Sequence, residues 1–205
     1  MPIGEMNRPG IVVGMNAEAR IARRSGFPVG TLGSAAKLLA AGADGLISFG
    51  IAGGLARGLR PGSLVLGTAL ITEGGQRYPA MDLFPNMEPA IRAPVFGGRE
   101  IVSRAEDKQA LHDTTGAVAV DLESAEVARL CAAAGVPFAI IRAIGDSAER
   151  DLPPAALVGL KTDGHVNLAA VLRSVWLAPS QIPVLIRVAL DTRLALATLR
   201  RVFQP

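Results

Sequence analysis

Short apolar runs recur along the chain and predict buried β-strands. They are rich in Val, Ile and Leu and are bounded by Gly, Pro or polar residues, the pattern of strands that are covered on both faces. A Pro-Gly turn at residues 61–62 introduces the longest run. The predicted strands are 11–13, 45–50, 63–72, 117–122 and 138–144.

Between these runs, apolar residues recur at helical spacing. The predicted helices are 17–24, 34–41, 105–112, 124–134, 166–176 and 182–203. Segment 73–98 holds four prolines and is predicted to be a loop. The alternation of strands and helices predicts an α/β fold with a mixed, mostly parallel central sheet flanked by helices. We expect a single domain over residues 1–205, in which 180–205 form an amphipathic, basic C-terminal helix.

Composition fits a compact apolar interior, because half of the 205 residues are hydrophobic and only 19% are charged. The 21 Lys and Arg residues exceed the 18 Asp and Glu residues only slightly and are scattered, so a nucleic-acid binder is poorly supported. The single cysteine, Cys131, excludes an internal disulfide, and His112 and His165 lack a metal-ligand pattern. No apolar run has the length of a membrane span, so we expect a soluble cytoplasmic protein.

Four segments follow predicted strands, at the sheet edge where α/β proteins bind ligands: 15–18, 50–54, 121–123 and 145–149. The glycine-rich segment 50–54 (GIAGG) would let a ligand approach the backbone closely, although a packing turn explains it equally well. It lacks the third glycine of the dinucleotide fingerprint, and no GK[ST] follows it. A dinucleotide-dependent oxidoreductase and a P-loop protein are therefore poorly supported.

The acidic residues of these segments have a functional and a structural explanation. Alternation places Asp121 and Glu123 on one side of the strand end and Leu122 on the other, yet at least one of the acids is expected to cap the next helix. Asp146 follows an apolar strand, where burial favours the protonated form of a general acid, or it caps a turn. Glu18 either holds a water or hydroxyl group or complements the dipole of its helix.

The order of the motifs is more specific than any one motif. The chain carries, in order, IVVGMxxE, FGIAGGL, LxPGSLVL, AVDLESAxVA and GVPFAIIRAIGDSA. Over residues 10–149 this order resembles the nucleoside phosphorylase and nucleosidase superfamily, in the branch of methylthioadenosine/S-adenosylhomocysteine nucleosidase. The following stretch, DLPPAALVGLKTDGHVNLAAVLRS, resembles hopanoid-associated phosphorylases and implies adenosylhopane as the substrate, from which adenine is released.

The resemblance implies a role for each motif. Asp146 would protonate N7 of the departing purine, Glu123 would hold the ribose 2′-hydroxyl, and Glu18 would position the attacking water. These roles suit N-glycosidic cleavage, which develops positive charge on the sugar and negative charge on the base. The other implied pocket residues are Leu122 at the ribose, Ile101 and Val102 at the adenine, and Gly50, Ile51, Ala52 and Gly53 around the nucleophile, phosphate or base. No metal and no cofactor is implied, with phosphate as a potential co-substrate.

The chain departs from the family pattern in four ways. Ile51 stands where the family usually has Ser or Thr, which favours water over phosphate without deciding between them. Gly145 replaces a Ser, and Leu122 replaces a Met under the sugar. The chain is also short before Ser34 and within 73–98, where the family has a strand pair and a helix.

The C-terminal helix bears on the substrate. From Ile182 onward, apolar residues fall on one helical face, and Arg187 and Arg201 lie opposite. Amphipathicity alone indicates a packing or subunit-interface helix. The functional alternative is a basic helix at an anionic membrane surface, close to a lipid substrate.

The expected reaction is the release of adenine from adenosylhopane by phosphorolysis or hydrolysis. Two alternatives stay open: a nucleosidase for methylthioadenosine or S-adenosylhomocysteine, and a non-catalytic purine-binding protein of the same fold. The resemblance also implies a homo-oligomer, with a dimer as the simplest case. We expect the protein in the cytoplasm, with peripheral contact to the inner membrane as the alternative.

Overall fold

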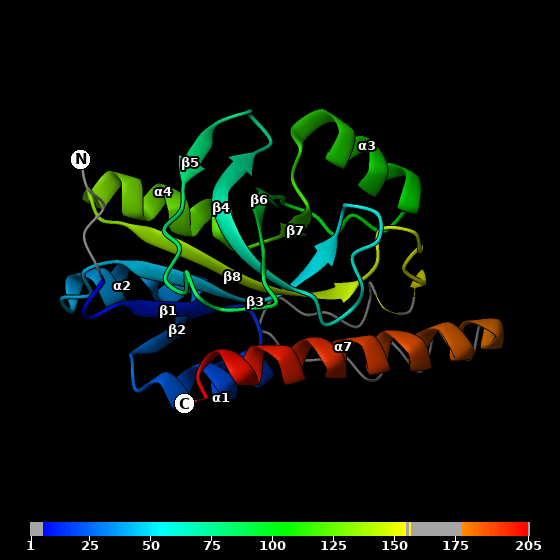
Figure 1. Ribbon diagram of the computed structural model, residues 1–205, viewed down its shortest axis with the longest axis horizontal. Helices are drawn as coiled ribbons and strands as arrows, with labels where there is room; N and C mark the ends of the chain where they lie inside the picture. Colours follow the sequence, from blue (N-terminus) through cyan, green and yellow to red (C-terminus); the bar gives the residue numbers. More distant parts are fainter. Residues whose placement is uncertain (1–5, 155, 157–177, 205) are drawn as a thin grey trace.

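In the part of the chain that the structure describes, a mixed, eight-stranded β-sheet carries helices on both faces (Figure 1). The computed structural model describes residues 6–154, 156 and 178–204. The strands of this part are β1 (Gly10–Val13), β2 (Val29–Thr31), β3 (Leu46–Gly54), β4 (Leu64–Thr72), β5 (Arg77–Pro79), β6 (Ile91–Gly97), β7 (Ala119–Asp121) and β8 (Phe138–Asp146).

Five α-helices are described, and they keep the labels of Figure 1. They are α1 (Asn16–Ala22), α2 (Ala35–Ala40), α3 (Ala105–Thr115), α4 (Ser124–Ala134) and α7 (Ile182–Val202). Short 3-10 turns occur at Arg23–Ser25, Leu32–Ser34 and Pro179–Gln181.

The sheet curls and closes on itself. Strands β1, β3 and β8 run parallel side by side, with β2 at the edge beyond β1. Strand β8 also pairs antiparallel with β4, β4 pairs with β6, β6 with β7, and β7 returns to the end of β3. The predicted mixed, mostly parallel sheet is confirmed. Because of this closure, the carboxyl ends of β1, β3, β7 and β8 meet at one end of the sheet.

The apolar strands are continuous in sequence because both faces of the sheet are covered. Alternate residues face opposite ways. On one face, Ile47 and Ile141 pack in a cluster with residues of α1 and α7, whereas Leu46 and Ile140 belong to the cluster beneath α2 and α4.

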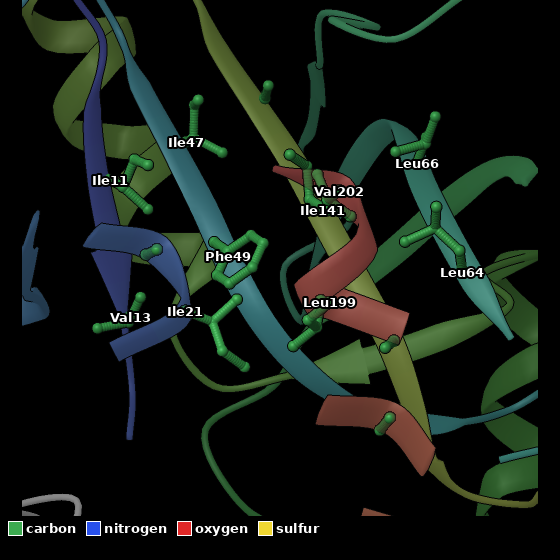
Figure 2. Packing of buried hydrophobic residues seen from close by; sticks show 14 of the residues in the cluster. Ile11, Val13, Ile21, Ile47, Phe49, Leu64, Leu66, Ile141, Leu199 and Val202 are labelled. Carbon is green, nitrogen blue, oxygen red and sulfur yellow. The ribbon is translucent and has the colours of Figure 1, made fainter. Parts of the chain in front are cut away.

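Helix α7 lies along the first of these faces (Figure 1). Leu199 and Val202 are buried against the sheet near Ile141 and Phe49, as Figure 2 shows. The ring of Phe203 lies 5.2 Å from that of Phe49. The second half of the helix is therefore part of the hydrophobic core, as its apolar face predicts.

The prediction of a loop at 73–98 is wrong, because this segment contains β5 and β6. Its prolines occupy positions that strands tolerate. Pro79 ends the three-residue strand β5. Pro94 falls where the register between β4 and β6 shifts, so the missing N–H of proline interrupts no regular ladder. Because proline in a sequence argues against a strand, β5 and β6 could not be predicted from this segment.

Segment 50–54 is also not a turn, because it forms the second half of β3. The predicted helices at 124–134 and 182–203 are confirmed to within one residue, and the one at 105–112 continues to Thr115. The short stretch before Ser34 contains the edge strand β2. The predicted helix at 166–176 lies outside the described residues.

Candidate active site

One cavity of about 350 Å³ opens at the end of the sheet where β1, β3, β7 and β8 finish. It gathers nine of the ten site residues predicted from sequence. They are Glu18, Ile51, Ala52, Gly53, Ile101, Val102, Leu122, Glu123 and Asp146. The lining residues that were not predicted are Gly14, Met15, Glu100, Val120, Asp121 and Leu152.

Two other hollows in the described part of the chain have similar or larger volumes. One lies beside Met87 and Arg201, and the other lies beside Thr72 and Leu111. Each is lined by a single acidic residue. Because glycosidic cleavage needs several groups that exchange protons around one substrate, the cavity with five carboxyl groups is the candidate site.

Glu18 stands in the first turn of α1 and is almost fully buried. Its Oε1 accepts a hydrogen bond of 2.8 Å from the amide of Ile51, and its Oε2 accepts bonds of 3.1 and 2.8 Å from the amides of Gly14 and Met15. Burial raises the pKa of Glu18 to about 7, although Arg142 and the amide bonds oppose the rise. Near neutral pH this carboxyl can therefore take up or release a proton.

Arg142 is the central cation beneath the cavity, and the sequence analysis missed it. It lies fully buried in β8, with Nε 3.0 Å from Oδ2 of Asp121 and Nη2 3.3 Å from Oε2 of Glu123. Nη2 also donates to the hydroxyl of Ser48 at 2.6 Å. The available signal was a lone charged residue inside the apolar run FAIIRAI, because an isolated buried charge needs partners.

Gly50 does not line the cavity but makes room behind it. A Cβ at this position would lie 2.6 Å from Oε1 of Glu18 and 2.7 Å from Nη1 of Arg142. The absence of a side chain therefore lets the carboxylate and the guanidinium approach each other across β3. This is a close approach inside a strand, in place of the predicted glycine turn.

The two acids after β7 divide the expected roles between them. Oδ1 of Asp121 accepts hydrogen bonds from the amides of Glu123 and Ser124, at 3.0 and 2.7 Å, so this residue caps the start of α4. Glu123 faces the cavity, where burial and the nearby Asp121 raise its pKa against the effect of Arg142. Leu122 lines the cavity as well and does not point away from it.

Asp146 is the last residue of β8. It forms an ion pair with a buried lysine that the sequence analysis missed. Nζ of Lys108, on α3, lies 2.5 Å from Oδ2 of Asp146. Burial raises the pKa of Asp146, and the charge of Lys108 opposes the rise. Lys108 sits in a polar helix, where one more charged residue carries no sequence signal.

Apart from Glu100, the rest of the cavity wall is apolar or glycine. Ile101, Val102 and Leu122 offer uncharged aliphatic contacts. Ile51 lies against Gly145, and a Cβ at Gly145 would overlap the Cγ2 methyl of Ile51. The two departures from the family pattern, Ile51 and Gly145, are therefore linked by packing. The large side chain of Ile51 in β3 leaves no room for a side chain at position 145 in β8.

The ionisable groups that line the cavity are all carboxyl groups. They belong to Glu18, Glu100, Asp121, Glu123 and Asp146. The nearby cations, Arg142 and Lys108, are buried behind the wall and already paired with carboxylates. The site can thus exchange protons and bind hydroxyl groups, but it offers an anion no cation among the described lining residues.

Comparison with known proteins agrees with this geometry. The family model described as "Phosphorylase superfamily" matches residues 28–95 and 88–175. A search among curated proteins finds no match.

Solved structures share the fold. Futalosine hydrolase of Helicobacter pylori aligns with 82% of this chain and 97% of its own, with a TM-score of 0.63 and 19% identity. The 5′-methylthioadenosine/S-adenosylhomocysteine nucleosidase of Neisseria meningitidis, in complex with methylthio-immucillin-A, aligns with 82% of this chain and 99% of its own, with a TM-score of 0.62 and 18% identity. The family match covers most of the sequence, and the chain therefore belongs to the phosphorylase superfamily, as an enzyme of the nucleoside phosphorylase or nucleosidase type.

Proposed function

We propose that this enzyme releases adenine from adenosylhopane by cleaving the N-glycosidic bond with water. The observation that carries the reaction type is the convergence of Glu18, Glu123 and Asp146 on one cavity, beside the apolar side chains of Ile101, Val102 and Leu122. These residues come from α1, the start of α4 and the end of β8, and the sheet closure brings them together.

The three carboxyl groups suit the charges of the reaction. As the C1′–N9 bond breaks, its electron pair moves onto the purine, and the Asp146 carboxyl gives its proton to N7. Glu123 accepts a hydrogen bond from the ribose 2′-hydroxyl. Water attacks C1′ and passes a proton to Glu18, whose pKa of about 7 suits a base at neutral pH. Ile101 and Val102 support the apolar faces of the base.

The lining of the cavity supports water as the nucleophile over phosphate. Phosphate is an anion, and the charged groups that line the site are carboxylates. Ile51 contributes a methyl group, where a hydroxyl could have bound a phosphate oxygen. The three amides near this position already donate to Glu18. Water needs no positive charge to bind beside a carboxylate.

The deciding experiment is adenine release from adenosylhopane dispersed in detergent, with and without phosphate. We expect release in both cases and ribosylhopane as the product in both. Release that depends on phosphate, with a phosphorylated product, would overturn the choice of water. No release in either condition would reject adenosylhopane as the substrate.

The second candidate is a nucleosidase for small adenosine thioethers. The shared fold with 5′-methylthioadenosine/S-adenosylhomocysteine nucleosidase favours it. Turnover of methylthioadenosine and S-adenosylhomocysteine in the same assay separates the two candidates. A higher kcat/KM on either small substrate than on adenosylhopane would favour this alternative. Tight adenine binding without turnover of any of them would indicate a purine-binding protein.

The surface of α7 supports a lipid substrate. Its exposed large apolar residues are Ile182, Val184, Ile186, Leu190 and Leu194. The one acidic residue of the helix, Asp191, is buried and paired with Arg150, so the exposed charges of α7 are arginines. Among the described helices none is long and apolar enough to cross a membrane. We propose that this helix lies on an anionic membrane surface, from which the substrate is taken.

Sedimentation with lipid vesicles tests this contact. The protein should sediment with phosphatidylglycerol vesicles more than with phosphatidylcholine vesicles, and Leu190→Glu should reduce the bound fraction. If the protein binds neither kind of vesicle, and if it forms a dimer that Leu190→Glu dissociates, this face is instead a contact between two copies of the chain.

A further inference from the structure

Lys108 is a buried cation that the proposed reaction leaves without a role. Its side chain has no exposed surface, and it reaches from α3 to the segment that follows β8. Nζ donates to Oδ2 of Asp146 at 2.5 Å, to the carbonyl oxygen of Ser147 at 3.1 Å and to that of Arg150 at 3.0 Å. All three hydrogens of the ammonium group therefore have acceptors, and all three acceptors belong to residues 146–150.

Lys108 does not line the cavity, whereas Asp146 does. The lysine thus touches the carboxyl from behind, on the side away from the substrate. A lone buried ammonium is costly, so its retention here depends on the carboxylate and the two carbonyl groups. The pair also fixes which oxygen of Asp146 is free: Oδ2 is held by Lys108, and no protein hydrogen bond to Oδ1 is found among the described residues.

We propose that Lys108 is a positioning residue of the reaction: its ammonium aims Oδ1 of Asp146 into the cavity and stabilises the carboxylate that forms when the proton passes to the leaving base. The inference rests on the function proposed above, in which Asp146 is the acid.

The step balances without any further reactant. The C1′–N9 bond breaks and its electron pair goes to the purine, while the Asp146 carboxyl transfers its proton to N7. The water oxygen bonds to C1′, and one water proton goes to Glu18. Lys108 gives up no proton in this step. It lies beside the negative charge that appears on Asp146, so the acid is strengthened where it must give up its proton.

The other charged groups around Asp146 are few. Arg150, in the loop after β8, lowers its pKa, and Asp191, on α7, raises it. Across the cavity lie the carboxyl groups of Glu18, Glu100, Asp121 and Glu123. Lys108 is the cation in direct contact with Asp146 among the described residues. Its removal should therefore change the titration of Asp146 more than any other single substitution.

The first test compares wild type with Lys108→Met and Lys108→Arg on a substrate that wild type turns over. Lys108→Met should lower kcat/KM by about 10- to 100-fold, the range for loss of a hydrogen bond to a charged group. It should also shift the pH profile: the loss of activity that accompanies deprotonation of Asp146 should occur at higher pH than in wild type. Lys108→Arg keeps the charge and should recover part of the rate and most of the wild-type pH profile. Lys37→Met, which removes an exposed lysine of α2, is the matched control and should behave as wild type.

A purely structural lysine would lower the rate without shifting the pH profile, and that result would overturn the proposal. If Lys108→Met does not fold, as judged by circular dichroism, Lys108→Gln replaces it, with the same expectations. An unchanged kcat/KM in either folded variant would also overturn it.

The second test does not need turnover. Carboxyl ¹³C resonances of aspartate-labelled protein, assigned with Asp146→Asn, report the titration of Asp146 directly. Removal of the lysine charge should raise its pKa relative to wild type, and an unchanged titration would contradict the inference. If wild type releases no adenine from any substrate, the proposed function fails, and this measurement still decides whether Lys108 controls the acid.

Discussion

At the residue scale, the site consists of carboxyl groups whose pKa values are set by burial and by two buried cations, Arg142 and Lys108. Glu18, Glu123 and Asp146 all have a raised pKa, and burial is the largest cause in each case. Arg142 and Lys108 oppose this rise from behind the wall. Burial therefore keeps protons available for the reaction, and the cations keep the ionised forms accessible.

Asp146→Asn should remove the proton donor and leave the shape of the cavity intact. We expect kcat to fall by about 10²–10⁴-fold, the usual contribution of a general acid. Asp113→Asn, at the exposed end of α3, serves as the control. Adenine release measured by absorbance checks the prediction. A rate within about a factor of two of wild type would contradict the role of Asp146 as the acid.

Glu18 should determine one limb of the pH profile. Its carboxylate form is needed to accept a proton from water, and its pKa is raised to about 7, so activity should rise as the pH increases through about 7. Glu18→Gln should abolish this limb and most of the activity. Glu126→Gln, an exposed acid on α4, should leave both unchanged. A limb that persists in Glu18→Gln would assign it to another group.

Ile51 and Gly145 should be energetically coupled. Gly145→Ser places a side chain into the Cγ2 methyl of Ile51, and such overpacking should lower the free energy of unfolding by about 1–3 kcal/mol. In the background Ile51→Ala, the same serine should cost much less. Gly33→Ser, at a glycine with open space around it, is the control. Urea denaturation of the four proteins of the cycle measures the coupling, and purely additive effects would show that the contact is not tight.

At the element scale, helix α7 has two different faces. Ala195, Leu199 and Val202 are buried against the sheet, while Ile186, Leu190 and other apolar residues are exposed. The pattern of apolar residues in the sequence predicts the helix and the burial of Leu199. It places Ile186, Leu190 and Leu194 on the same apolar face, and this part of the prediction is wrong, because the structure leaves these three side chains exposed. These exposed apolar residues are not needed for packing against the sheet, which is why we propose a membrane surface as their partner.

Substitutions on the two faces of α7 should differ in their effect on stability. Leu199→Ala removes a fully buried side chain and should lower the free energy of unfolding by about 2–5 kcal/mol. Leu194→Ala, on the exposed face of the same helix, should change it by about 0.5 kcal/mol or less. Urea denaturation without lipid compares them directly. An equally large effect of Leu194→Ala would show that this face is covered in solution.

Strands are less evident than helices at this scale. The buried strands β3, β4 and β8 follow directly from their apolar runs. The edge strand β5 and the strand β6 were missed because Pro79 and Pro94 make them look like loop. Their pairing with β4 stabilises them, and such long-range partners are not visible in a local window of sequence.

At the scale of the whole molecule, the closed sheet brings segments 14–18, 51–53, 100–102, 120–123 and 146–152 together in one site. Strand β3 lies between Glu18 on one side and Arg142 on the other, and Gly50 is the point at which these side chains meet. The site is thus sensitive to a residue that does not line it.

Gly50→Ala should disturb this crossing. The added methyl would lie 2.6 Å from Oε1 of Glu18, so either the carboxylate or the strand must shift. We expect a loss of about 10²-fold in kcat/KM, as for a misplacement of about 1 Å in a catalytic group. Gly74→Ala, in an open turn, should have no such effect. Retention of full activity in Gly50→Ala would show that Glu18 need not be held in this position.

The amino-acid sequence alone was enough to predict the α/β class, the core strands β1, β4 and β8, the first half of β3, and the helices α4 and α7. This was possible because apolar periodicity and the order of the motifs are local properties of the chain. The closure of the sheet, the separate positions of Asp121 and Glu123, and the buried partners Arg142 and Lys108 became visible only in the folded chain. These depend on which segments meet in space, and an ion pair across 38 residues, as between Lys108 and Asp146, exists only once the fold has removed both groups from water.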